Sequence, residues 1–169
     1  DWAAAGRAVA TAARKARAAK VVMVLPDEVD EPNTRALVEG AWLGSYQFTR
    51  FRSSDDNGSS QLAEIVVVGG GVTAKWAANI DIVMRHANAS RDLSNTPANH
   101  LTPPQLADYA RSVARAIPGL TCTVLGPREL EKLGAGALLC VAQGSVEPAQ
   151  MIVLKWTPNT VKAKTVLGI

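Results

Sequence analysis

The chain is poor in the residues that most often bind metals. It holds two histidines and two cysteines among its 169 residues. Cys122 and Cys140 form no C-x-x-C pair and have no histidine at metal-binding spacing, so the sequence does not predict a zinc site. Small free cysteines usually pack like apolar side chains, and we therefore expect both to be buried thiols of an intracellular protein.

Long apolar runs are also absent. The run from Ile65 to Val68 is followed by glycines, far short of the roughly 20 residues that a transmembrane helix needs. Hydrophobic residues make up 47% of the chain and charged residues 20%, a balance typical of one ordinary globular domain or two small ones. The net charge of +3 is too small to indicate nucleic acid as a partner.

The chain has neither an initiator methionine nor a signal peptide. It opens with Asp1-Trp2, and we expect it to be a fragment or a processed piece. Its alanine- and arginine-rich opening contains no serine before Ser45, unlike a transit peptide, and favours a structural helix.

Spacings of three and four residues predict that one face of this first helix packs on a sheet. The predicted face consists of Trp2, Ala5, Val9, Ala12, Ala16 and Ala19. The basic residues lie elsewhere, namely Arg7, Arg14, Lys15 and Arg17. They could contact phosphates, but without interleaved aromatic residues a solvated helix surface is the favoured interpretation.

Two apolar segments, 20–25 and 62–68, are predicted to be strands. The acidic loop between Asp27 and Glu31 lacks the ligand spacing of a calcium loop and is expected to be solvated. Asn33 or Thr34 is expected to cap the helix that follows, and 53–60 is expected to be a turn-forming loop. The apolar residues of that helix are Ala36, Leu37, Ala41, Trp42 and Leu43. The glycines at 69–71 do not form a phosphate-binding pattern and favour a tight strand-to-helix crossing.

A long helix is predicted from about 72 to 93, ending before Pro97. Its predicted buried face consists of Trp76, Ile80, Val83 and Ala87. Asp81 and Arg85 are spaced to form an ion pair on it, and His86 is expected on its surface.

Thr102 and Gln105 form a predicted capping box that starts the next helix. The apolar face expected for that helix is Leu106, Tyr109, Ala110, Val113 and Ala114. Strands are predicted at 120–125, 151–156 and 165–169, with short helices at 127–133 and 136–143. This order is that of an α/β sandwich in its opening part.

The carboxylates after Pro97 are scattered singly along the chain, at Asp108, Glu129, Glu131 and Glu147. Hydrolysis by metals needs several ligands converging on one or two cations, and no Ser-His-Asp order or H-E-x-x-H motif is present either. From the residues alone, the chain is a piece of a soluble α/β protein without an active site of its own.

Three segments in register resemble the leucyl (cytosol) aminopeptidase family. Residues 91–103 read RDLSNTPANHLTP and match the family pattern R-D-L-x-N-x-P-x-N-x-L-T-P. Residues 39–46 read EGAWLGSY and match E-G-x-x-L-G-x-Y. Residues 133–148 match a third family segment through LGAGALL, VAQGS and Glu147-Pro148.

The resemblance implies an α/β chain with part of a macro-like N-terminal domain at 1–71, a linking helix at 72–95 and the opening of the catalytic domain at 96–169. It also implies a cytoplasmic, hexameric enzyme that cleaves N-terminal residues from peptides with two divalent metals, usually zinc, manganese or magnesium. The family's metal ligands and its catalytic lysine and arginine are expected beyond Ile169. We therefore predict no catalytic, cofactor-binding or metal-binding residue within this chain, and expect it to need the enzyme's remaining segments as partners.

A non-catalytic binding module is the alternative. Some family members bind DNA, and macro-like folds elsewhere bind ADP-ribose. Within this chain the alternative depends on the basic helix face and on the glycines at 69–71.

Overall fold

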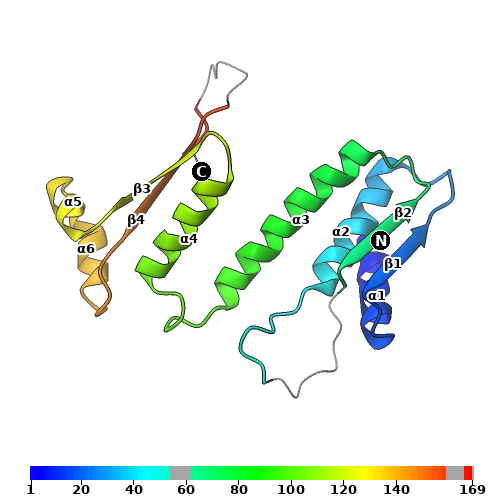
Figure 1. Ribbon diagram of the computed structural model, residues 1–169, viewed down its shortest axis with the longest axis horizontal. Helices are drawn as coiled ribbons and strands as arrows, with labels where there is room; N and C mark the ends of the chain where they lie inside the picture. Colours follow the sequence, from blue (N-terminus) through cyan, green and yellow to red (C-terminus); the bar gives the residue numbers. More distant parts are fainter. Residues whose placement is uncertain (54–61, 159–165, 169) are drawn as a thin grey trace. The chain divides into compact units, whose positions relative to one another are not determined.

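A computed structural model describes residues 1–53, 62–158 and 166–168. The chain divides into two compact units, Asp1–Asn95 and Thr96–Ile169 (Figure 1). The boundary between the two units comes directly after the long helix, at Asn95. The domain boundary expected at 71/72 stays a prediction. In the part of the chain that the structure describes, no helix is both long and apolar enough to cross a membrane.

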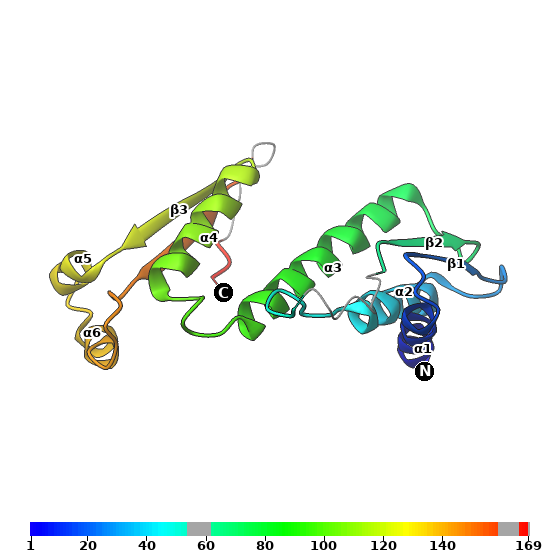
Figure 2. The ribbon, with the colours of Figure 1, turned by 60° about the horizontal axis from the view of Figure 1, so that its bottom comes forward.

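The first unit combines three helices with a two-stranded parallel sheet. Its elements are α1 (Trp2–Lys15), β1 (Lys20–Val24), α2 (Glu31–Ser45), β2 (Glu64–Val68) and α3 (Ala74–Asn95). The strands pair in register from Lys20 opposite Glu64 to Val24 opposite Val68. Figure 2 shows the two strands side by side, with α1 and α2 on the same side of them.

The core of this unit lies between one sheet face and helices α2 and α3. It is centred on Met23, Leu37, Val38, Ile80 and Met84, with alternate strand residues packed against it. Successive side chains of a strand point to opposite faces, so Val22, Val24 and Val68 are exposed on the other face. The expected α/β class is confirmed.

The buried face of α1 differs from the predicted one. Its buried residues are Gly6, Ala10 and Ala13. Of the predicted face only Val9 is even partly buried; Trp2, Ala5, Ala12, Ala16 and Ala19 are exposed. The reason is that α1 packs on α2 rather than on the sheet: a Cβ atom at Gly6 would collide with the Leu37 carbonyl oxygen, and one at Gly40 with that of Ala3.

Helix α2 begins earlier than predicted. Asp30 is its N-cap and accepts a hydrogen bond from the Asn33 backbone amide at 2.9 Å, so the expected cap at Asn33 or Thr34 was wrong. Proline at the second helical position is favourable there because its missing amide would have no helical partner. Thr34 is instead fully buried, and its hydroxyl donates to the Gly70 carbonyl at 3.2 Å. Leu43 is exposed.

Helix α3 has the predicted long form, with one shift in its buried face. Ile80 and Met84 are buried, whereas Val83 is 48% exposed. Helical periodicity allows either a three- or a four-residue step after Ile80, and packing selects the four-residue step. The predicted Asp81–Arg85 ion pair is confirmed at 2.8 Å, and His86 is exposed as expected.

The second unit contains α4 (Pro103–Ala116), β3 (Leu120–Leu125), α5 (Pro127–Lys132), α6 (Gly136–Ala142) and β4 (Met151–Trp156). The strands are antiparallel, with Leu120 opposite Trp156 and Leu125 opposite Met151. The predicted capping box is confirmed, because the Gln105 side chain accepts from the Thr102 amide at 2.8 Å.

Three expectations for this unit were wrong in whole or in part. On α4, Ala110 is buried and Val113 and Ala114 are half-buried as predicted, but the larger Leu106 and Tyr109 are each 37% exposed and Ala107 is buried instead. Cys122 is only half-buried. Cys140 is exposed, and it lies on the short helix α6, none of whose residues is buried. Residues 166–168 form no strand, while the other positions of the predicted strand, like most of the loop expected at 53–60, lie outside the described residues.

Candidate functional site

Two of the family-like segments meet in space at the ends of α2 and α3. The Tyr46 hydroxyl donates a hydrogen bond to the Asp92 carboxylate at 2.7 Å, although the residues are 46 positions apart. The Asn95 side-chain amide donates to the Tyr46 hydroxyl oxygen at 3.1 Å. We call Tyr46, Arg91, Asp92 and Asn95 the Tyr46 cluster. The hydroxyl is therefore both donor and acceptor within it.

Arg91 joins the same cluster over the face of the Tyr46 ring. Its guanidinium carbon lies 3.9 Å from the centroid of the Tyr46 ring, a cation–π geometry. Its Nη1 donates to the Leu43 carbonyl at 2.9 Å and to the Asn88 side chain at 3.3 Å. The last carbonyls of a helix lack helical partners and favour positive charge, and the last turn of α2 has no basic residue of its own. Arg91 of α3 therefore caps α2.

The surroundings of Tyr46 keep its hydroxyl protonated. Desolvation raises the pKa of Tyr46 above 10.0, and the hydrogen bond and negative charge of Asp92 act in the same direction. The hydrogen bond from Asn95 and the charge of Arg91 oppose this shift of the pKa. A neutral phenol at physiological pH serves as a donor rather than as a base.

No local sequence pattern predicts the Tyr46 cluster. Tyr46 and the segment from Arg91 to Asn95 were recognised only as letters of two separate motifs. Their occurrence in family-like patterns was the available signal, but nothing in the spacing joins position 46 to position 92.

The glycines at 69–71 serve backbone geometry, as predicted. Their φ values are +83°, +64° and +68°, in the left-handed region that side chains disfavour. A Cβ atom at Gly69 would also collide with the Leu25 carbonyl oxygen. Both observations explain glycine here without a phosphate ligand.

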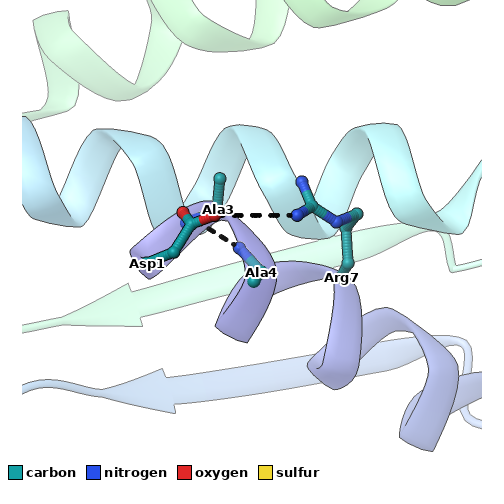
Figure 3. Close-up of polar contacts among 4 residues, drawn as sticks. All are labelled: Asp1, Ala3, Ala4 and Arg7. Carbon is teal, nitrogen blue, oxygen red and sulfur yellow. Dashed lines mark hydrogen bonds and ion pairs between the residues drawn. The ribbon is translucent and has the colours of Figure 1, made fainter.

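The basic face of α1 is partly neutralised by the acidic residue that caps the helix. The Asp1 carboxylate accepts hydrogen bonds from the amides of Ala3 at 3.0 Å and Ala4 at 3.4 Å (Figure 3). The same carboxylate lies 3.8 Å from the Arg7 guanidinium. All four basic residues are exposed, as expected of a solvated surface.

The donor groups in the described ranges do not fit a divalent metal centre. Across these ranges no three histidine, cysteine or acidic side chains gather closely enough to hold an ion. Asp30 caps α2, Asp108 pairs with Arg111 at 2.7 Å, and Glu129 accepts from the Gly126 amide at 3.1 Å. These three carboxylates thus serve local structure. That this chain holds no catalytic or metal-binding residue stays a prediction.

A pocket of about 390 Å³ lies in the first unit beside β2, α2 and α3, and its lining includes the acidic residues Glu64 and Asp81. Val38, Ile65 and Ile80 contribute to its lining, and Trp76 lies on its α3 side. The Trp76 Nε1 atom is buried and has no hydrogen-bond partner within the described parts of the chain.

Comparison with known proteins relates both units to one family. Residues 1–55 match the model of the cytosol aminopeptidase family, N-terminal domain, and residues 88–169 match that of its catalytic domain. A probable cytosol aminopeptidase of Solibacter usitatus is 39% identical over 152 residues, which cover 89% of this chain and 31% of that protein. One of Roseiflexus castenholzii is 37% identical over 155 residues, covering 89% and 32%.

Solved structures with a similar fold include a leucine aminopeptidase. A mutant of tomato leucine aminopeptidase superposes with a TM-score of 0.81 at 27% identity, covering 97% of this chain and 34% of that protein. The bottromycin maturation enzyme BotP, in complex with Mn, gives a TM-score of 0.73 at 31% identity, covering 94% and 34%. The chain therefore spans about a third of the length of the relatives it matches.

Proposed function

The chain belongs to the cytosol aminopeptidase family, and we propose that it is a segment of a metal-dependent aminopeptidase that removes N-terminal residues from peptides. The single observation that supports this most is the match of both family domains, in order, on one chain of 169 residues. The junction segment at residues 91–103 lies where the second of these matches begins.

We propose that the whole enzyme uses two divalent cations, zinc or manganese, to activate the water that attacks the peptide bond. A related structure contains Mn. Because the described residues offer no fitting donor set, the ligands are proposed to lie in the part of the enzyme that these 169 residues do not include. The present segment would then supply architecture rather than chemistry.

We further propose a cytoplasmic enzyme that assembles as a homohexamer and acts on peptide substrates. These proposals rest on the family alone. The alternative of a DNA- or ADP-ribose-binding module is not favoured, because Asp1 partly neutralises the basic face and backbone geometry accounts for the glycines.

The test compares the full-length enzyme with the 169-residue chain. Both would be assayed with leucine p-nitroanilide and manganese, before and after dialysis against EDTA. We expect turnover only by the full-length protein, lost with the metal and restored on its return. An inactive, correctly folded full-length protein, or one whose activity survives metal removal, would contradict the proposal.

A further inference from the structure

We propose that Tyr46 is a positioning residue: through the Tyr46 cluster it fixes the last turns of α3, after which the second unit begins. The expected effect on kcat rests on the proposed function. The fixing of the end of α3 by Tyr46 rests only on contacts within the first unit.

The two halves of α3 are held in different ways. The first half is anchored in the core by Ile80 and Met84, its only buried residues. From Met84 to Asn95 the helix extends about 16 Å further at 1.5 Å per residue. Full burial therefore ends at Met84, and the later apolar residues Ala87, Ala89 and Leu93 are only half-buried.

Beyond the last fully buried residue of α3, polar contacts from α2 hold the helix. Arg91 reaches the Leu43 carbonyl, and both Asp92 and Asn95 hydrogen-bond to the Tyr46 hydroxyl. A hydrogen bond to a charged acceptor is stronger than a neutral one, and the 2.7 Å distance to Asp92 is typical of such a bond. One hydroxyl thus holds the last turn of α3 against the end of α2 through two of its residues.

The cluster also constrains α2 in return. Tyr46 is the C-cap residue of α2, where the backbone leaves the helix with a ψ of 133°. Arg91 covers its ring and binds the carbonyl three residues earlier, so the helix end and the aromatic ring are fixed by one side chain. Losing the hydroxyl would remove the hydrogen bonds to Asp92 and Asn95 and loosen the end of α3, while the contacts of Arg91 and the apolar core around Met84 would remain.

This location matters because Asn95 is the last residue of the first unit. A freer helix end would loosen the backbone that leads from α3 into the second unit. Catalysis is sensitive to small displacements of groups that have been placed by folding. We therefore expect the rate of the chemical step to suffer more than substrate binding.

The test uses the full-length enzyme with Tyr46→Phe, which keeps the ring under Arg91 and removes only the hydroxyl. Tyr109→Phe is the matched control, since Tyr109 is the other tyrosine of the chain and lies exposed on α4. Hydrogen exchange would follow the amides of residues 85–95. We expect about tenfold faster exchange there for Tyr46→Phe, with amides of β1 and β2 and the control unchanged.

Kinetics give the second readout. Tyr46→Phe should lower kcat about two- to tenfold with KM within about twofold of wild type, and the control should match wild type. Asp92→Asn, which keeps an acceptor for the hydroxyl, should lie between them. Unchanged exchange at 85–95 would overturn the inference, as would faster exchange with full kcat. If wild type itself is inactive, the proposed function fails, while the exchange data still decide whether Tyr46 fixes α3.

Discussion

At the scale of single residues, Arg17 stands out for its backbone. Its φ of +55° is the only positive value at a non-glycine residue among those described. The amides of Arg17 and Ala18 donate to the carbonyls of Arg14 at 3.1 Å and Ala13 at 2.9 Å, which closes α1 at a position that usually carries glycine. The side chain therefore imposes a conformational cost.

Replacing this residue should relieve that cost. We expect Arg17→Gly to raise the unfolding free energy of the first unit by about 0.5–1 kcal/mol, because glycine adopts this conformation freely. Urea unfolding followed by circular dichroism measures it. Lys15→Gly, inside the last helical turn, is the control and should destabilise by a similar amount. A destabilised Arg17→Gly would show that the arginine side chain makes a compensating contact.

At the scale of elements, the close approach of α1 and α2 defines the first unit. Gly6 and Gly40 each face the backbone of the opposite helix, with the Ala41 amide nitrogen 2.7 Å from where a Cβ of residue 6 would lie. Backbone atoms cannot rotate away as a side chain can, so the helices would have to separate.

We accordingly expect Gly6→Ala to destabilise the first unit by about 1–3 kcal/mol, despite alanine's higher helix propensity. The melting temperature of the chain would report the loss. Gly136→Ala is the matched control, because a Cβ there meets nothing within 4 Å. Equal melting temperatures for Gly6→Ala and wild type would mean that the two helices pack less closely than described.

The helices and strands also show which features local sequence patterns can predict. The strands at 120–125 and 151–156 occur as predicted, since alternation and turn residues are local signals. The predicted face of α1 failed because alanine occurs all around this helix, so apolar spacing could not single out the side that packs. The buried side of α1 is set by the close approach of Gly6 to the backbone of α2. That approach depends on the partner helix, which spacing within α1 does not reveal.

At the scale of the whole molecule, both sheets of the described chain expose large apolar side chains. Val24 is 73% exposed on the first sheet, and Trp156 is 60% exposed on the second. Strand edges and apolar faces of this kind promote association.

We expect the 169-residue chain to self-associate and to bind manganese no more tightly than millimolar, because no donor cluster lies in its described ranges. Light scattering across a concentration series and isothermal titration would measure the two properties. The full-length enzyme serves as the reference for both. Micromolar manganese binding by a monomeric 169-residue chain would contradict both expectations.

The sequence by itself determined the order of helices and strands up to Trp156, the end of the long helix before Pro97, the capping box at Thr102 and the family. Each of these is encoded by neighbours within a few positions or by a motif in register. Only the tertiary structure decided which face of α1 is buried, that Cys140 is exposed and that Tyr46 meets Asp92. These depend on where the chain returns in space, because a hydrogen bond across 46 positions leaves no trace in local spacing.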